Sequence, residues 1–239
     1  VADQLTKVMA FKAQWAIRLL FLLPGSSLCL DVQAEPLAPE LCYWAHRAAG
    51  LIAVDGRLDE PSWQRAPWTT SFHDIEGSPS PLPEFQTRCK VLWNDDFLYV
   101  AADLQDRHVW ATIKQRDATI YHDNDFEIFI DPDGDTHEYY EVEINAFGTI
   151  LDQLLTKPYR DGGTAVTAWD IGGLQSAVQI WGTLNNPLDE DEGWTVEMAL
   201  PWPVLKECAH RSVPPKAGDY WRVNFSKGAV GRKWKIGKG

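Results

Sequence analysis

The amino-acid sequence predicts an all-β protein, an antiparallel β-sandwich with short helical turns. Short apolar segments that suit strands are separated by turn residues roughly every dozen positions, and helical periodicity is scarce. The 239 residues are 45% hydrophobic and 12% aromatic, so the chain can bury a full core. We therefore expect one sandwich domain over residues 35–226, with an extension at each end.

The N-terminal extension, residues 1–34, has the pattern of a secretory signal peptide. Lys12 and Arg18 precede an apolar run over residues 19–30, and Val32-Gln33-Ala34 offers small residues to a signal peptidase. An ordinary N-terminal helix is the alternative. No other apolar run is long enough to span a bilayer. We expect the mature protein to be secreted, either to the outside of the cell or into a periplasm.

The C-terminal extension, residues 227–239, is a basic tail on an acidic chain. It holds five basic residues and no acidic one, whereas the whole chain has a formal net charge of −12. We expect this tail to be disordered or a non-native terminus, and a basic docking arm is the alternative.

Charge and cysteine content narrow the partners. An acidic protein is repelled by nucleic acid and by anionic membrane surfaces, so calcium or neutral polar ligands fit better. Beyond the predicted signal peptide lie Cys42, Cys89 and Cys208, an odd number without the CxxC spacing of a zinc or redox site. Cys89 alternates with apolar residues and suits a core position. Cys42 and Cys208 could form a disulfide bond, but the sequence does not decide the pairing.

Nine segments have the composition of strands. The first is a short apolar run, the next two are joined by Asn94-Asp95-Asp96 at the spacing of a hairpin, and the rest are bounded by turn residues. In chain order the predicted strands are 51–54, 87–93, 97–104, 126–131, 139–145, 148–155, 177–181, 194–200 and 220–226.

The connections are predicted as turns, loops and short helices. Asp55-Gly56 suits a turn, after which Leu58 and Trp63 can reach the core. Three prolines make residues 78–83 a loop, because proline lacks the backbone donor that helices and ladders need. Residues 109–120 suit a loop with a helical turn that carries Trp110, and residues 204–210 suit a short helix.

The hairpin formed by strands 126–131 and 139–145 carries most of the chemistry. Successive strand residues point to opposite faces, so Phe126, Ile128 and Ile130 share an apolar face. Glu127 lies on the other face, where an antiparallel partner can place Glu143 directly opposite, with Cβ atoms about 5 Å apart. One face therefore builds core, and the other presents carboxylates and the amide of Asn145.

The turn of this hairpin is a candidate calcium loop. Asp131, Asp133 and Asp135 alternate as in the opening of such a loop, and carboxylates are the oxygen ligands that Ca²⁺ prefers. An EF-hand would need Gly and Glu where this chain has Thr136 and Val142, so an EF-hand is excluded. A different calcium loop and a solvated acidic turn both remain.

The residue types around the hairpin suit sugar binding. Sugars stack their C–H faces on flat aromatic rings while carboxylates and amides take the hydroxyl groups. Tyr121 lies six residues before Glu127, and Trp110 falls in a loop-like segment.

Two alternative functions stay open. Paired carboxylates could act in a glycoside hydrolase, although a sandwich face lacks a deep cleft to raise the pKa of an acid. A haem-binding electron-transfer sandwich needs Met and His ligands, and Met198 alternates like a core residue.

Four blocks in order resemble the family 9 carbohydrate-binding modules and their secreted, DOMON-like relatives, over residues 43–226. The blocks read IAVDGRLDEPSW, KVLWNDDFLYVAADLQD, DNDFEIFIDPDGDTHEYYEVEINAFGT and GWTVEMALPW. The resemblance implies a β-sandwich that binds mono- or oligosaccharides or polysaccharide chain ends without catalysis, in polysaccharide breakdown, with structural calcium as cofactor.

The same resemblance implies site residues. Tyr121 takes the place of a Trp that stacks on the sugar six residues before the strand glutamate, which corresponds to Glu127. An Arg-x-Asn that bonds hydroxyl groups corresponds to Glu143-Ile144-Asn145, so the Asn is kept and the Arg is not. The basic tail stands where the family has further strands and a second stacking Trp. Trp110 is the candidate for a second aromatic.

Overall fold

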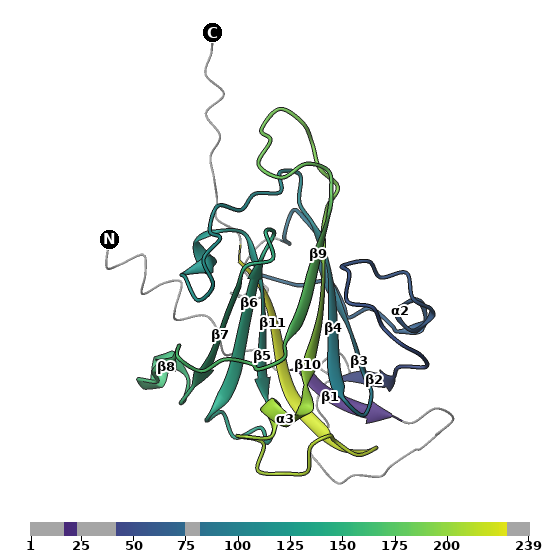
Figure 1. The fold of residues 1–239 in the computed structure, drawn as a ribbon, viewed down its shortest axis with the longest axis vertical. Coiled ribbons are helices and arrows are strands. Elements are labelled where there is room, and N and C mark those ends of the chain that lie inside the picture. The colour runs from purple at the N-terminus through teal and green to yellow at the C-terminus, as the bar shows by residue number, and fades with distance from the viewer. Residues whose placement is uncertain (1–16, 23–41, 75–81, 229–239) are drawn as a thin grey trace.

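Strand pairing dominates the computed structural model, which describes residues 17–22, 42–74 and 82–228 (Figure 1). Its strands form one hydrogen-bonded ladder in the order β8-β7-β6-β5-β11-β1-β2-β3-β4-β10-β9. The strands are β1 (Ile17–Leu22), β2 (Cys42–Arg47), β3 (Thr87–Trp93), β4 (Phe97–Gln105), β5 (Asp125–Asp131), β6 (Tyr139–Asn145), β7 (Ile150–Leu155), β8 (Ala165–Val166), β9 (Gln175–Trp181), β10 (Gly193–Pro201) and β11 (Tyr220–Gly228). The helices are α2 (Pro61–Arg65), α3 (Trp202–Leu205) and the 3-10 turns η2 (Ile120–His122) and η3 (Tyr159–Asp161).

This continuous sheet folds over itself into a sandwich. Figure 1 shows β5, β6, β7 and β11 on one side and β3, β4, β9 and β10 on the other. A single core cluster joins the two halves, since it contains Ile128 and Val142 from the first half and Val100 and Val196 from the second. The predicted β-sandwich is confirmed. Its pairing is not antiparallel throughout, because β2 runs parallel to both β1 and β3.

The hairpin of β5 and β6 has the predicted register. Glu127 pairs with Glu143, and Asp125 pairs with Asn145. The apolar face lies in the core, where Phe126, Ile128 and Ile130 are completely buried. Because side chains alternate, the paired glutamates face away from that core. The predicted division of the hairpin into an apolar and a polar face is therefore confirmed.

Eight of the nine predicted strands are present, with bounds that differ by at most two residues. The predicted strand at 51–54 is wrong, because this segment has no ladder partner and packs Ile52 and Val54 on a smaller core cluster instead. The helix expected at 204–210 is α3, four residues long and earlier in the chain. Residues 109–119 are loop and turn, and the 3-10 turn η2 follows at 120–122.

The segment between β2 and β3 covers the outer face of β10. Gly56 turns the chain with a φ of +86°, and a Cβ there would lie 2.8 Å from the backbone nitrogen of Gln179, so only glycine fits. Trp63 of α2 is completely buried and Leu58 is partly buried against the same cluster, so both reach the core as predicted. This packing buries the carboxylate of Glu197 on β10.

Part of each predicted extension belongs to the ladder. β1 falls inside the predicted signal peptide, and its Leu19 and Phe21 are buried. β11 runs through Lys227 and Gly228, so the predicted tail begins at least two residues later. Residues 1–16, 23–41 and 229–239 lie outside the described part of the chain. Cleavage after Ala34 stays a prediction.

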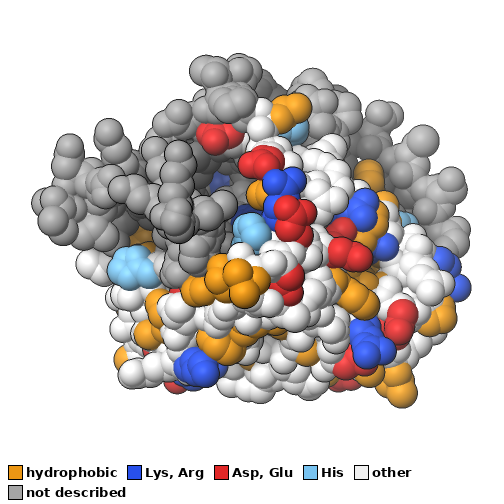
Figure 2. Space-filling model, turned by 90° about the horizontal axis from the view of Figure 1, so that it is seen from above, with side chains coloured by type: hydrophobic (Ala, Val, Ile, Leu, Met, Phe, Trp, Pro, Cys, Tyr) orange, Lys and Arg blue, Asp and Glu red, His pale blue; other side chains and the backbone are white. Residues whose placement is uncertain are grey.

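Three further observations concern thiols, surface charge and membrane spans. Cys42, Cys89 and Cys208 are free thiols, so the disulfide considered between Cys42 and Cys208 is not formed. Seen from above, acidic and basic side chains are interspersed with hydrophobic ones (Figure 2), so the described residues on this face present no single-sign surface. Within the described ranges, no helix has the length and apolar character needed to cross a membrane.

Candidate functional site

Three carboxylates converge on the polar face of the β5–β6 hairpin. Asp125, Glu127 and Glu143 each offer an oxygen within 4.8 Å of the others. Their side chains are almost completely buried, with exposed fractions of 0%, 3% and 1%. Strand register explains the convergence, since Glu127 pairs with Glu143 and Asp125 lies two residues before Glu127 on the same face. The spacing of two from Glu127 is the sequence signal that could have added Asp125 to the candidate site.

Asn145 lies at the end of this carboxylate row, and its side-chain amide is fully hydrogen-bonded within the protein. Its side-chain amide donates to the carbonyl of Ile113 at 2.8 Å and to Asp123 at 3.1 Å. Its side-chain oxygen accepts from the backbone N–H groups of Phe147 and Thr149. A side-chain amide has two donor hydrogens and two acceptor lone pairs, so these bonds satisfy it.

Asp123, which accepts a hydrogen bond from Asn145, also bonds the loop before β5. One carboxylate oxygen accepts from the backbone N–H groups of Thr112 and Ile113, both at 2.8 Å, and the other accepts from the Thr112 hydroxyl. Burial acts to raise the pKa of Asp123, but these bonds and the Asn145 amide outweigh it and lower the pKa below its usual value. Asp123 and Asn145 together hold the loop at 111–113 against β6.

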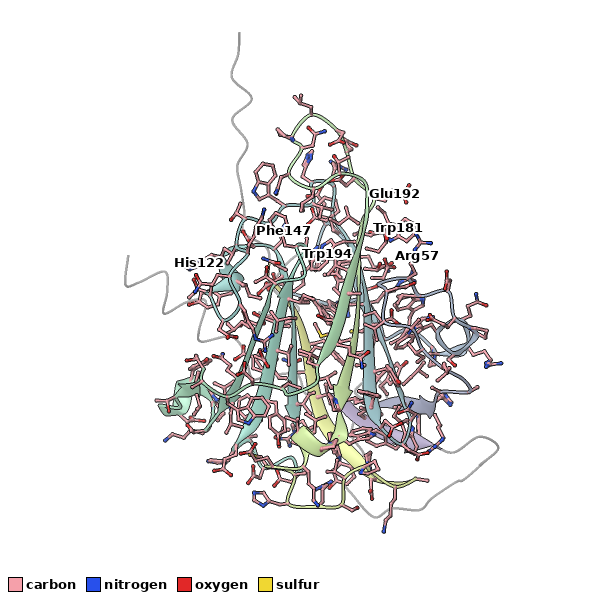
Figure 3. All side chains as sticks on the ribbon, in the orientation of Figure 1. Arg57, His122, Phe147, Trp181, Glu192 and Trp194 are labelled. Carbon is pink, nitrogen blue, oxygen red and sulfur yellow. The ribbon has the colours of Figure 1, made fainter. Side chains whose placement is uncertain are left out.

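The two candidate aromatic residues lie in the connection between β4 and β5. Tyr121 is partly exposed within η2, and its ring meets the His122 ring edge-on at 4.8 Å (His122 is labelled in Figure 3). Trp110 is partly buried in the preceding loop. That loop is fixed on both sides of Trp110, since the N–H groups of Val109 and Ala111 donate to Asp191 and Asn185. The structure thus brings Glu127 and Glu143 together, and it places the aromatic residues on the segment that leads into their strand.

The acidic turn of the hairpin brings Asp131, Asp133 and Asp135 within 4.8 Å of one another. Both oxygens of Asp131 accept backbone N–H groups, from Gly134 and Thr136. Burial raises the pKa of Asp131, although these bonds oppose the rise.

Two arginine side chains compete with any cation at this turn. Arg222 lies 3.8 Å from Asp131, and Arg211 donates to the carbonyl of Asp133. Three carboxylates fit part of the six to eight oxygen ligands of Ca²⁺. Arg222 already balances part of the charge of Asp131, so these residues fit calcium only in part.

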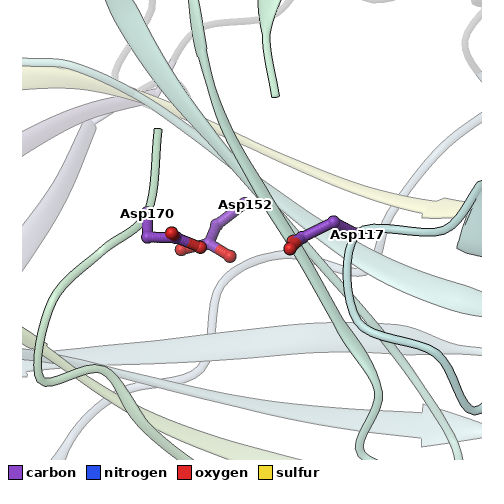
Figure 4. Close-up of side chains that lie close together, drawn as sticks. All are labelled: Asp117, Asp152 and Asp170. Carbon is purple, nitrogen blue, oxygen red and sulfur yellow. The ribbon is translucent and has the colours of Figure 1, made fainter. Parts of the chain in front are cut away.

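A third acidic cluster, which sequence reasoning missed, joins three separate segments. Asp117, Asp152 and Asp170 approach one another where a loop meets β7 (Figure 4). The guanidinium of Arg116 bonds Asp152 and Asp170, the latter at 3.2 Å, and lies 3.7 Å from Asp117. A cation of the protein's own therefore already occupies this cluster. The segments are too far apart in sequence for any local pattern to have predicted it.

The haem alternative finds no support at Met198. Its side chain is completely buried in the main core, on β10 between Val100 of β4 and Ser176 of β9. A side chain packed in this way serves the core and is not presented to a cofactor cavity.

The fold defines a class, the β-sandwich modules, and in this chain three carboxylates gather on the polar face of one hairpin. Within that class the chain belongs to the carbohydrate family 9 binding domain-like family, whose sequence model matches residues 54–218. The match includes the β5–β6 hairpin, the segment that covers Glu197, and both aromatic candidates. The resemblance in the four sequence blocks is thereby confirmed.

Two curated relatives match this chain over the same number of residues. Exoglucanase XynX of Acetivibrio thermocellus is 24% identical over 153 residues, which are 64% of this chain and 12% of that protein. Endo-1,4-beta-xylanase A of Thermoanaerobacterium saccharolyticum is 23% identical over 153 residues, which are 64% of this chain and 11% of that protein. This chain therefore corresponds to a small part of each relative.

Three solved structures are similar to this chain. A putative carbohydrate-binding protein from Bacteroides uniformis superposes with a TM-score of 0.50 at 18% identity, over 68% of this chain and 71% of that one. A family 9 module from Caldicellulosiruptor kristjanssonii in complex with glucose gives a TM-score of 0.46 at 19% identity, over 75% and 74%. A family 9 module from the same organism in complex with cellotriose gives a TM-score of 0.43 at 18% identity, over 66% of each chain.

Proposed function

We propose that this chain is a noncatalytic module that binds carbohydrate at the polar face of the β5–β6 hairpin. The observation that carries the proposal is that the family match spans the hairpin, where Asp125, Glu127 and Glu143 converge within 4.8 Å. Carboxylates accept hydrogen bonds from vicinal sugar hydroxyl groups, which is the task that such a cluster can perform. Tyr121 offers a partly exposed ring to the C–H face of the same sugar.

Asn145 has a supporting role in this proposal. Its amide is used by Ile113, Asp123, Phe147 and Thr149, so it positions the connection before β5 and does not reach a ligand. Trp110 lies on the same connection and is the second aromatic candidate. We expect mono- or oligosaccharides, or the ends of polysaccharide chains, as ligands.

The relatives support a place in polysaccharide breakdown. Both are named for hydrolysis of glucan or xylan, and the matched stretch is a small part of each. A binding module raises the local concentration of an attached enzyme on its polymer by making the second contact intramolecular. Secretion and a weak calcium site at Asp131, Asp133 and Asp135 belong to the same proposal.

Calorimetry of the full chain with glucose, cellotriose and xylotriose tests the proposal. We expect saturable binding that weakens at least about tenfold in Glu127→Gln and in Tyr121→Ala, because each removes a contact worth about 1.4 kcal/mol or more. Tyr220→Ala is the matched control, since this tyrosine is 44% exposed on β11. Absence of heat with every saccharide, in a chain shown to be folded, would overturn the proposal.

The same proteins separate binding from glycoside hydrolysis. Carboxylates about 5 Å apart also suit a retaining glycosidase. We expect no turnover of aryl glycosides by the full chain. Turnover that is lost in Glu127→Gln would replace the binding role with a catalytic one.

A further inference from the structure

A groove lies on the opposite outer face of the sandwich from the hairpin. Its cavity volume is about 340 Å³, and its lining combines two indoles, one aliphatic side chain and several polar groups. The lining residues are Arg57, Leu58, Asp59, Trp68, Asp103, Trp181 and Thr195. The strand residues belong to β4, β9 and β10, whereas the hairpin belongs to β5 and β6. Figure 3 shows Trp181 and Arg57 close to each other on the β9 side, away from His122.

Sheet register keeps the Trp181 indole accessible. Trp181 is the last residue of β9, and its partner across the ladder is Gly193, which has no side chain to cover the ring. Glycine is required there, because a Cβ would lie 2.1 Å from the carbonyl oxygen of Leu104. Trp181 therefore remains 46% exposed although it belongs to a regular strand. Large exposed aromatic rings beside a groove are typical of binding surfaces.

Two cations lie over the ring of the second indole, Trp68. The guanidinium carbon of Arg88 and the ammonium of Lys90 each lie 4.3 Å from the ring centroid of Trp68. Lys90 is anchored in turn by a hydrogen bond to the carbonyl of Trp63. A ring fixed by two cation–π contacts loses little conformational entropy when a ligand binds.

The polar groups of the groove suit hydroxyl groups. Arg88 donates twice to one oxygen of Asp103, at 3.0 and 2.9 Å. These bonds fix the carboxylate and leave its other oxygen unused by Arg88. Arg57 and Asp59 are exposed at the rim with opposite charges. The rim therefore favours a neutral, hydroxyl-rich ligand over a strongly charged one.

We propose that this groove is a second saccharide-binding site, separate from the hairpin site. The sugar stacks on Trp181, with Trp68 as the rigid wall, and its hydroxyl groups bond Asp59, Asp103 and Arg57. The cavity volume lies within the range of about 300–1,000 Å³ typical of small-molecule sites. Two sites on opposite faces would let one module contact two segments of a polysaccharide.

The test is a titration of the full chain with cellotriose and xylotriose, followed by calorimetry and by the indole N–H signals in nitrogen-labelled protein. We expect two sites per chain, and Trp181→Ala removes one of them or weakens it at least about tenfold. The control is Trp44→Ala on β2, because Trp44 has the same exposed fraction of 46%. The indole signal that disappears in Trp181→Ala is the one expected to shift on titration.

The proposals for the two sites can be refuted independently. Glu127→Gln leaves binding at the groove intact, so loss of the hairpin site alone leaves this inference standing. Asp59→Ala, at the exposed rim, repeats the test if Trp181→Ala does not fold. Unchanged stoichiometry and affinity in both groove variants, with no shift of the Trp181 signal, would overturn the inference.

Discussion

The indole N–H of Trp63 donates to the buried carboxylate of Glu197 at 2.8 Å, across 134 residues of sequence. The other carboxylate oxygen accepts from the backbone N–H groups of Asp55 and Gly56, at 3.0 and 3.1 Å. One strand glutamate thus fixes the whole segment that covers β10. The same segment supplies Arg57, Leu58 and Asp59 to the groove, so Glu197 joins the core to a candidate binding surface.

Because Glu197 is buried, we expect the free energy of unfolding to depend on pH. Burial raises its pKa to about 7, although Trp63 and the two backbone N–H groups oppose the rise. The unfolded chain has a glutamate pKa of about 4.3, so between that pH and about 7 the folded chain binds more protons than the unfolded one. The contribution of Glu197 to the free energy of unfolding therefore falls as pH rises through this window, and it is constant above it.

Urea unfolding at several pH values measures this contribution. Glu197→Gln loses the pH dependence and lowers the free energy of unfolding by about 1–3 kcal/mol, because an amide cannot accept all three N–H groups. Glu192→Gln, at an exposed position at the end of the β9–β10 loop, is the control. Equal slopes in Glu197→Gln and in the unmodified chain would contradict the prediction.

The hydrogen bond between Asn145 and Asp123 leads us to expect that Asn145, a predicted site residue, acts through the stability of the fold. Asn145→Asp places an oxygen where the amide donates to Ile113 and Asp123, so acceptors face each other in a buried position. We expect a loss of about 3 kcal/mol or more in urea unfolding, larger than in Asn145→Ala. Because the pKa of Asp123 is lowered, its own contribution is present above about pH 3.9 and is lost as pH falls through the folded pKa.

Binding measurements on the same variants separate support from direct contact. If Asn145 supports the site, affinity falls in parallel with stability, and Asp123→Asn, which has no direct role, shows the same parallel loss. Full stability of Asn145→Ala combined with loss of saccharide binding would show instead that the amide contacts the ligand.

The sequence could predict the hairpin because its information is local. Alternation in β5 and β6 determines which side chains face the core, and a turn of Pro, Gly and Asp sets the register that pairs Glu127 with Glu143. The strand bounds follow from the same period of two. Asp125 was missed, although the same pattern makes it the next residue on the polar face.

Long-range contacts could not be predicted in this way. Glu197 alternates with core residues and so has the pattern of a solvent-facing strand position, and only the covering segment makes it buried. The bond between Asn145 and Asp123 joins two single polar residues without any spacing rule. The groove depends on Gly193 lying opposite Trp181, which becomes visible only once β9 and β10 are paired.

Calcium is predicted to bind the hairpin turn weakly. Three carboxylates attract the cation, but Arg222 at 3.8 Å from Asp131 already balances part of their charge. We expect a dissociation constant on the order of 10⁻⁴–10⁻³ M, as in weak extracellular modules, measured as a rise in the thermal unfolding temperature with added CaCl₂. Asp133→Asn removes this rise, and Asp170→Asn, in the cluster filled by Arg116, does not. An unfolding temperature that is the same in calcium and in EGTA would contradict the prediction.

Substitution of Phe21 tests whether β1 contributes to the stability of the folded protein. Its ring is completely buried and meets Trp93, Trp202 and Trp221 edge-on, with centroids 5.5–6.1 Å apart. Apolar runs of this length also suit a signal peptide, and one mature chain cannot use residues 17–22 for both roles. If β1 belongs to the fold, Phe21→Ala lowers the free energy of unfolding by about 3–5 kcal/mol, whereas Leu51→Ala, at a 96% exposed position, leaves it unchanged. Equal stability of Phe21→Ala and the unmodified chain, together with a mature N-terminus at residue 35 in mass spectra of exported protein, would assign the segment to export instead.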